Sequence, residues 1–497
     1  MPQLCIQPAV RPEDRLTLNK EQKRIIARPG DATTKVLAGA GTGKTRVLVE
    51  RYLKFVFEDG VAPDNLLALT FTKKAAAEMH GRVFKEVVRR DDKAVLRDLY
   101  GAWIMNFHQF AFRVIKENSA LFGIDPDVTV ASEVDIVRTK RSVQQSFEAG
   151  TIDGVPDNYD EDMPAPNRMG RYFERCLKVI DKVRGNLWTP ASLRETIRPE
   201  DVPAYGRYID TIIAVWHAYE KDLHNRLLLD FADMIRIVVD EFSKNGRLRA
   251  QYAGRFKHVL VDEFQDTNEA QNELLRLLTG DRFPRVTVVG DEKQSIYRWR
   301  DARIENLREF AGEELYLTKN YRSTQTILDL AYHVLVEDPY FEARKNAVHL
   351  TADRAPNSAP VCLFHPPEGA EPSAAAEAKA LGAWVLAMTA QAPAVEGLDF
   401  YVDNPPRLDY DDVAILVRSL KPVSGLPYYE EELKRLKIPY AIVGGVSRLD
   451  GVSVNCHFTT WMKVPQRRYF PFCSCVGYNS VNHYPIFTAL IVNSSCM

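Results

Sequence analysis

The chain has 497 residues, which is too long for a single hydrophobic core and, at roughly 100–200 residues per domain, predicts about two to four domains. Apolar residues make up 45% of it and charged residues 27%, a composition that excludes collagen-like, mostly disordered and polytopic membrane proteins. The net charge is only −2, so binding to a polyanion would need a local basic surface. Because no apolar run reaches ~18–20 residues and the first 15 residues lack an apolar signal core, we expect a cytoplasmic protein without membrane contact.

Short apolar runs alternate with helical patterns near the beginning of the chain and again after residue 257. The predicted strands are Lys35–Ala38, Leu66–Leu69, His258–Val261 and Val286–Val289, and the predicted helices are Arg46–Phe57, Ala75–Val83 and Glu269–Leu278. Strands that alternate with helices predict a parallel α/β sheet. Residues 121–250 between them look mostly helical, so we expect a helical insertion in this sheet.

A second α/β region follows, with candidate strands Val361–Phe364, Val413–Val417 and Tyr440–Val443. We therefore expect a first domain over residues 1–120 and 215–315, an insertion over 121–214 and part of a second domain over 316–450. Residues 451–497 form a tail of a different kind.

The tail differs from the rest of the chain in composition. All 67 acidic residues lie at or before Asp450, whereas four of the seven cysteines lie after it. Three interpretations stay open: a translated shifted frame or unspliced segment, which the abrupt change favours, a divergent C-terminal module, or a metal site. The metal site would use residues whose spacing does not match the usual zinc motifs: Cys456, His457, Cys473, Cys475 and His483.

A glycine-rich turn lies between the first predicted strand and helix. It consists of Ala38, Gly39, Ala40, Gly41, Thr42, Gly43, Lys44 and Thr45. Small residues let backbone N–H groups approach phosphates, and the helix N-terminus adds its positive dipole end. Lys44 would reach the β- and γ-phosphates, and Thr45 would place its hydroxyl on Mg²⁺.

An acidic pair, Asp262 and Glu263, follows the strand His258–Val261. Asp262 would hold Mg²⁺, and Glu263 would orient or deprotonate the attacking water. Together with the glycine-rich turn, this pair predicts that the chain binds and hydrolyses a nucleoside triphosphate.

Four longer motifs follow one another in the chain. Residues 70–79 read TFTKKAAAEM, residues 261–268 VDEFQDTN, residues 290–300 GDEKQSIYRWR and residues 320–323 NYRS. In this order they resemble the motifs of UvrD/Rep-type superfamily one DNA helicases, with weaker echoes at residues 18–22, 107–108 and 229–232. With lysine at position 293, the motif at residues 290–300 also resembles that of the AddA/RecB branch of the superfamily.

The resemblance implies a role for each matching residue around a nucleotide. Gln22 and Arg46 would hydrogen-bond the adenine, and Tyr321 would stack on it. Gln294 would sense the γ-phosphate, and Arg322, from the second domain, would stabilise the charge on it during hydrolysis.

The resemblance also implies a channel for single-stranded DNA. Tyr297 and Trp299 alternate with two arginines in the sequence. Aromatic faces together with guanidinium groups suit the binding of stacked bases. The residues expected to line this channel are Phe71, Thr72, Phe107, His108, Tyr297, Trp299 and Arg300.

The fold implied is α/β, with a RecA-like P-loop NTPase domain that carries a helical insertion and part of a second RecA-like domain. We find no counterpart of the family's late motifs, so the chain resembles a C-terminally truncated member. The expected function is an ATP- and Mg²⁺-dependent DNA helicase or translocase, moving 3′ to 5′ on single-stranded DNA and acting on 3′-tailed duplexes with repair or recombination proteins as partners. Two alternatives remain: a chain that binds ATP and single-stranded DNA without unwinding, or the helicase part of an AddA/RecB-like nuclease-helicase.

Overall fold

The computed structural model describes residues 17–156, 169–196, 202–298, 301–337, 348–354, 373–390, 409–410, 413–416, 426–440, 442, 447–449, 452–454 and 489–492. The chain divides into two compact units, residues 1–358 with 473–477, and residues 359–472 with 478–497. In the part of the chain that the structure describes, none of the helices has the length and apolar character needed to cross a membrane.

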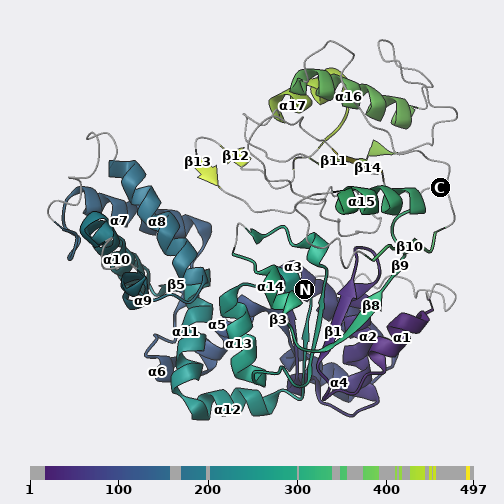
Figure 1. The fold of residues 1–497 in the computed structure, drawn as a ribbon, viewed down its shortest axis with the longest axis horizontal. Helices are drawn as coiled ribbons and strands as arrows, with labels where there is room; N and C mark the ends of the chain where they lie inside the picture. Colours follow the sequence, from purple (N-terminus) through teal and green to yellow (C-terminus); the bar gives the residue numbers. More distant parts are fainter. Residues whose placement is uncertain are drawn as a thin grey trace. The chain divides into compact units, whose positions relative to one another are not determined.

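The first unit is built around a six-stranded sheet (Figure 1). Its strands are, in spatial order, β3 (Trp103–Asn106), β2 (Leu66–Thr70), β6 (His258–Val261), β7 (Val286–Gly290), β1 (Thr34–Ala38) and β8 (Glu313–Leu317). Every neighbouring pair is parallel. The predicted α/β class is confirmed, and the four predicted strands of this region lie in the sheet, whereas β3 and β8 were not predicted.

Both faces of the sheet are covered by helices, which explains why its central strands are mostly apolar. In β2, Leu66 and Ala68 belong to one core, and Leu67 and Leu69 belong to the other. Helices α1 (Lys20–Ile26), α2 (Lys44–Phe57) and α3 (Lys73–Arg89) supply the first core, and α5 (Phe107–Glu117), α11 (Phe231–Lys244), α12 (Gly246–Arg255) and α13 (Glu269–Thr279) supply the second. With both faces covered, the loops at the carboxyl ends of the strands are the place for a site. Short helices α4 (Lys93–Asp98), α6 (Ser119–Phe122) and α14 (Ile304–Arg308) complete this part.

A group of helices between α6 and α11 has a hydrophobic core of its own, in the region where an insertion was predicted (Figure 1). The helices are α7 (Glu133–Glu148), α8 (Met169–Gly185), α9 (Pro190–Glu195) and α10 (Val202–Asn225). Phe173, Cys176 and Trp216 are buried at its centre. The short parallel strands β4 (Thr129–Val130) and β5 (Leu228–Leu229) pair where the chain enters and leaves this group.

A buried ion-pair network joins the inserted helices to the sheet domain. Arg184, near the end of α8, is 1% exposed and makes two hydrogen bonds to Asp230, of 2.8 and 3.0 Å. Its guanidinium also lies 2.5 Å from Asp233, which is in the first turn of α11. The side chain of Asp233 is fully buried. Tyr219 donates a third hydrogen bond to Asp230, at 3.2 Å. The network fixes the end of α8 against the start of α11.

The first unit ends with a short segment that lies beyond the predicted domain boundary at residue 315. It contains β9 (Lys319–Asn320), α15 (Gln325–Glu337) and β10 (Thr351–Ala352), and β9 pairs in parallel with β10. The predicted domain boundaries remain predictions.

In the second unit, α16 (Ala374–Ala390) and α17 (Leu426–Arg435) bury Trp384 and Leu433 in a small core, to which β11 (Val413–Leu416) contributes partly buried side chains. Strand β14 (Ala489–Val492) pairs antiparallel with β11, and β12 (Ser447–Leu449) pairs with β13 (Val452–Val454). The predicted strand Val361–Phe364, part of the predicted strand at 440–443 and the five cysteine and histidine residues of the tail lie outside the described residues.

The Arg184 network predicts a large loss of stability for Arg184→Ala, because this substitution leaves buried Asp230 without its cation and Asp233 with Arg236 as its remaining one. We expect the free energy of unfolding to fall by about 3–5 kcal/mol in urea-induced unfolding followed by circular dichroism. Arg194→Ala, which removes an exposed pair with Asp210, is the control and should cost less than ~1 kcal/mol. Equal losses of unfolding free energy in the two variants would contradict the large contribution of the network to stability.

Candidate active site

The glycine-rich turn connects β1 to α2, as the sequence predicts. Two of its glycines have left-handed backbone, with φ of 75° at Gly41 and 92° at Gly43. A Cβ atom on Gly41 would lie 2.7 Å from the Arg322 Cβ, and one on Gly43 would lie 2.9 Å from the Gln22 Nε2. The turn therefore needs glycine for two reasons, its dihedral angles and the close approach of other segments. The hydroxyl of Thr42 donates to the Gly39 carbonyl at 2.8 Å and closes the loop.

Lys44 and Glu263 form an ion pair at the first turn of α2. The Lys44 Nζ lies 2.7 Å from the Glu263 Oε2, and the Lys44 side chain is 9% exposed. Burial alone would lower the pKa of Lys44, but the charges of Glu263, Asp291 and Asp262 reverse this effect and raise it. The pKa of Glu263 is lowered despite its burial, chiefly by Lys44 and by a hydrogen bond from Gln265. Both side chains are therefore charged at neutral pH.

Thr45 and Asp262 lie together beside this pair. The Thr45 hydroxyl donates to the Asp262 Oδ2 at 3.1 Å. Burial, reinforced by the charge of Glu263, raises the pKa of Asp262 to about 6. A hydroxyl and a buried carboxylate that lacks full charge compensation are hard oxygen donors of the kind that Mg²⁺ prefers, so these two residues fit the predicted metal.

The backbone of Glu263 is strained, with a left-handed φ of 50° and ψ of 46°. This conformation is rare for residues other than glycine and typically costs about 1–3 kcal/mol. It turns the chain from β6 into the 3₁₀ turn Phe264–Asp266, directly after Asp262. The two acids thus point to the phosphate loop from consecutive positions.

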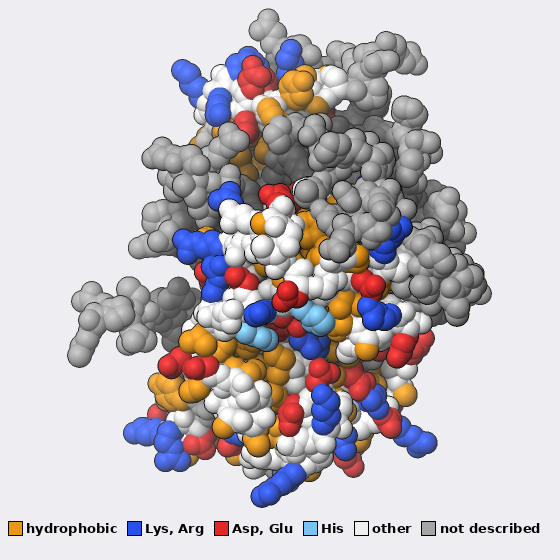
Figure 2. Space-filling view, turned by 90° about the vertical axis from the view of Figure 1, so that its left-hand side faces the viewer, with side chains coloured by type: hydrophobic (Ala, Val, Ile, Leu, Met, Phe, Trp, Pro, Cys, Tyr) orange, Lys and Arg blue, Asp and Glu red, His pale blue; other side chains and the backbone are white. Residues whose placement is uncertain are grey.

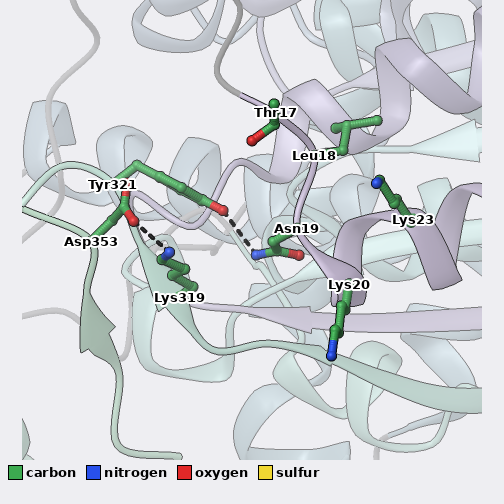
Figure 3. A pocket seen from close by; sticks show the side chains of 8 residues that line it. All are labelled: Thr17, Leu18, Asn19, Lys20, Lys23, Lys319, Tyr321 and Asp353. Carbon is green, nitrogen blue, oxygen red and sulfur yellow. Dashed lines mark hydrogen bonds and ion pairs between the residues drawn. The ribbon is translucent and has the colours of Figure 1, made fainter.

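Residues expected to contact the nucleotide base lie near the start of α1 and in the segment after β9. A pocket of about 350 Å³ is lined by Thr17, Leu18, Asn19, Lys20, Lys23, Lys319, Tyr321 and Asp353 (Figure 3). Asn19 and Tyr321 point toward one another, and the Asn19 amide donates to the Tyr321 hydroxyl at 2.9 Å. Lys319, which pairs with Asp353, lies 5.8 Å above the Tyr321 ring. The ring is half-buried and held in place at the edge of this pocket.

Gln22, predicted to contact adenine, is fully buried. Its Nε2 donates to the Thr42 carbonyl at 3.3 Å, and its Oε1 accepts from the Asn19 backbone at 3.1 Å as part of a helix capping box. Both ends of the amide are thus used by the protein in this conformation. Arg46, its predicted companion, is half-buried in the first turn of α2.

The segment 320–323 is docked on the phosphate loop. The Asn320 Nδ2 donates to the Ala40 carbonyl at 2.5 Å, and the Tyr321 N–H donates to the Gly41 carbonyl at 2.8 Å. The Asn320 Oδ1 accepts from the N–H groups of Arg322 and Ser323, at 2.8 and 2.7 Å. Arg322 is exposed, and its charge contributes to the lowered pKa of Glu263. The structure thus brings the predicted arginine to the predicted phosphate site.

Gln294, the predicted sensor of the γ-phosphate, lies after β7 in the 3₁₀ turn Glu292–Gln294. Its Nε2 donates to the Asp291 Oδ2 at 2.6 Å. Asp291 also raises the pKa of Lys44, so this turn adjoins the phosphate site.

The predicted DNA-contacting residues other than Phe107 fall into three groups. Phe71 and Tyr297 lie together, with ring centroids 4.9 Å apart, and exposed Thr72 caps α3 beside them. His108 packs edge-on against Phe231, and burial together with Lys73 lowers the pKa of His108 to about 4, which leaves the imidazole neutral at pH 7. Trp299 and Arg300 lie outside the described residues.

Phe107 is placed differently from what its predicted role requires. Its side chain is 2% exposed and belongs to the core between the sheet and helices α5, α11 and α13. The ring is therefore not presented to a ligand in this conformation.

Charge on the visible face of the molecule is mixed. Figure 2 shows Lys and Arg side chains interspersed with Asp and Glu among the described residues, without a broad area of one sign. This distribution agrees with the net charge of −2.

Residues 18–314, more than half of the chain, match the family model of the UvrD/REP helicase N-terminal domain. The chain belongs to this family. It is 32% identical over 325 residues to DNA helicase II of Haemophilus influenzae and 32% identical over 323 residues to ATP-dependent DNA helicase PcrA of Staphylococcus aureus. Each match covers 64% of this chain, which spans about 40% of the length of these curated relatives. The resemblance inferred from the motifs is thus confirmed.

Three residues of this UvrD/REP-family site were given no role from the sequence: Asn19, Gln265 and Asn320. The spacing of Asn19 and Gln22 is that of a capping box, and this local signal could have indicated Asn19. Asn320 and Gln265 lie inside recognised motifs, but Asn320 contacts Ala40, 280 residues away, and Gln265 contacts Asp291, 26 residues away, which local spacing does not indicate.

The close approach at Gly41 predicts that Gly41→Ala disturbs the docked segment. The added methyl group would both strain the backbone and meet Arg322, so we expect at least about tenfold weaker binding of a fluorescent ATP analogue. Gly60→Ala is a matched control, since its φ of 66° carries a similar strain in open space. Equal nucleotide affinity in the two variants would contradict this interpretation of the loop.

Proposed function

We propose that this chain is the motor part of an ATP-dependent DNA helicase that moves 3′ to 5′ along single-stranded DNA. The observation that carries the proposal is the convergence of Lys44, Glu263 and Arg322 on one glycine-rich loop. The names of the relatives, DNA helicase II and ATP-dependent DNA helicase PcrA, support the same activity.

Nucleotide binding would begin with a change of partner for Lys44. A phosphate group entering the loop would compete with Glu263 for the ammonium group 2.7 Å away. The Glu263 carboxylate is deprotonated in this conformation because Lys44 and Gln265 lower its pKa, so it could orient the attacking water. Loss of the Lys44 charge would raise that pKa and make the carboxylate a better acceptor of the water proton. Arg322, at the edge of the loop, would stabilise the charge that develops on the transferred phosphoryl group.

Thr45 and Asp262 are the residues that would hold Mg²⁺. When bound, the metal would neutralise developing charge on the phosphate oxygens. Their hydroxyl and carboxylate are already in contact, so no rearrangement of the chain is needed to bring the two donors together.

Single-stranded DNA would be gripped by aromatic stacking beside β2 and β7. Phe71, Thr72 and Tyr297 form one surface of this kind, and His108 with Phe231 forms another. A neutral histidine suits stacking on a base better than attraction to a phosphate. Because the ring of Phe107 is buried, the proposal leaves it out.

Removal of the Lys44 ammonium tests the nucleotide site. In Lys44→Ala we expect ATP hydrolysis, measured with and without oligo(dT), to fall by about 10²–10³-fold, as expected on loss of one transition-state contact. Lys85→Ala, an exposed lysine of α3, should hydrolyse ATP like the unmodified chain. Normal hydrolysis in Lys44→Ala would exclude this loop as the phosphate site.

Strand displacement on 3′- and 5′-tailed duplexes distinguishes a helicase from a chain that binds DNA and hydrolyses ATP without unwinding.

The aromatic surface predicts a defined loss of DNA affinity. Tyr297→Ala should weaken oligo(dT) binding, measured by fluorescence anisotropy, by about 1–3 kcal/mol, the usual contribution of one stacked base. Tyr100→Ala, which removes an aromatic ring that is 86% exposed elsewhere, should leave the affinity unchanged. If the two variants bind alike, the DNA surface lies elsewhere.

A further inference from the structure

Gln265 is a buried polar residue without a role in the proposed chemistry. It lies in the 3₁₀ turn after Glu263, and its side chain is 1% exposed. A buried amide needs hydrogen-bond partners, and the identity of those partners shows what it holds in place. Here both ends of the amide are engaged, each with a different functional segment.

The donor end of the amide holds Glu263, the candidate general base. The Gln265 Nε2 donates to the Glu263 Oε2 at 2.9 Å, the same oxygen that pairs with Lys44. It also lies 3.3 Å from the Asp266 Oδ2. If a phosphate draws Lys44 away, Gln265 remains as a donor to Glu263.

The acceptor end holds the turn that follows β7. The Gln265 Oε1 accepts from the Asp291 N–H at 3.0 Å. Separately, the Ser295 hydroxyl donates to the backbone carbonyl of Gln265 at 3.3 Å. The Asp291 carboxylate in turn accepts from the Gln294 amide at 2.6 Å and from the Lys293 N–H at 3.1 Å. Hydrogen bonds are therefore continuous from Lys44 to the turn that leads to Tyr297.

The packing around Gly290 supports this reading independently. A Cβ at this position would lie 2.8 Å from the Gln265 Oε1 and 2.9 Å from the Leu307 Cδ2. The end of β7 thus approaches the amide as closely as only glycine permits.

We propose that Gln265 is a positioning residue that holds Glu263 and transmits its displacement to residues 291–298. The inference rests on the proposed function, because it assumes that a nucleotide displaces Glu263 from Lys44. Coupling of this kind needs contiguous contacts that respond together, and the amide joins the two segments directly.

Two variants break this connection in different ways. Gln265→Met keeps an unbranched side chain of similar length but removes the donor and the acceptor, and Gly290→Ala displaces the amide without changing it. Gly254→Ala, in open space on α12, is the matched control. If Gln265→Met does not fold, Gly290→Ala carries the test.

The first measurement is hydrogen exchange of the peptide covering residues 291–298, with and without a non-hydrolysable ATP analogue and Mg²⁺. We expect the analogue to change exchange in the unmodified chain and in Gly254→Ala, but not in Gln265→Met or Gly290→Ala. The second is steady-state hydrolysis, in which both variants should lose DNA stimulation and at least about tenfold in kcat, with KM for ATP within about threefold.

The inference would be overturned if both variants show the same exchange response and the same kinetics as the unmodified chain. It would also be overturned by the absence of any nucleotide-dependent change at residues 291–298 in the unmodified chain when binding of the analogue is measured. Failure of the unmodified chain to bind the analogue at all would instead overturn the proposed function. Parallel loss of kcat and nucleotide affinity would indicate that Gln265 only supports the fold of the loop.

Discussion

The ion pair between buried Lys44 and partly exposed Glu263 links the two loops that make the candidate nucleotide site. Its single ammonium group faces Glu263 directly and is also influenced by Asp262 and Asp291, so negative charge exceeds positive charge in this buried region. The excess of negative charge contributes to the raised pKa of two acidic residues that do not pair directly with Lys44. Burial and the charge of Glu263 raise the pKa of Asp262 to about 6 and that of Asp266 to about 7. Such a site favours the arrival of further cations, which in the proposed function are Mg²⁺ and the guanidinium of Arg322.

The strand order explains how this pair arises. Lys44 follows β1 and Glu263 follows β6, and these strands are separated in the sheet by β7. The ion pair therefore spans the end of β7, which places Asp291 near Lys44. The left-handed backbone of Glu263 is tolerated because the ion pair and the bond from Gln265 fix its side chain. Strain at this residue is thus matched by contacts from two other segments.

Local signals in the sequence predicted the phosphate loop, the acidic pair and four strands of the sheet, since each depends on neighbouring residues alone. The contacts of Asn19 with Tyr321, 302 residues away, could not be predicted, because they depend on how distant loops meet. Strand β8 has exposed and charged residues at one edge of the sheet and lacks the apolar pattern of a buried parallel strand. The buried position of Phe107 could have been foreseen: with Phe110, Ala111 and Val114 it forms an apolar stripe at helical spacing, and His108 lies off that stripe.

The two ends of a nucleotide would be contacted by consecutive residues, Tyr321 beside the base pocket and Arg322 beside the phosphate loop. Both are positioned by Asn320, which is 1% exposed and bonded to the loop on one side and to the following N–H groups on the other. Asn320 belongs to β9, and β9 is held by β10 and by the bond from the Asp353 N–H to the Asn320 carbonyl, at 2.7 Å. A displacement of β10 would therefore move Tyr321 and Arg322 together. Binding of the base and stabilisation of the phosphate would then be gained or lost in one step, as the proposed alternation between two nucleotide states would need.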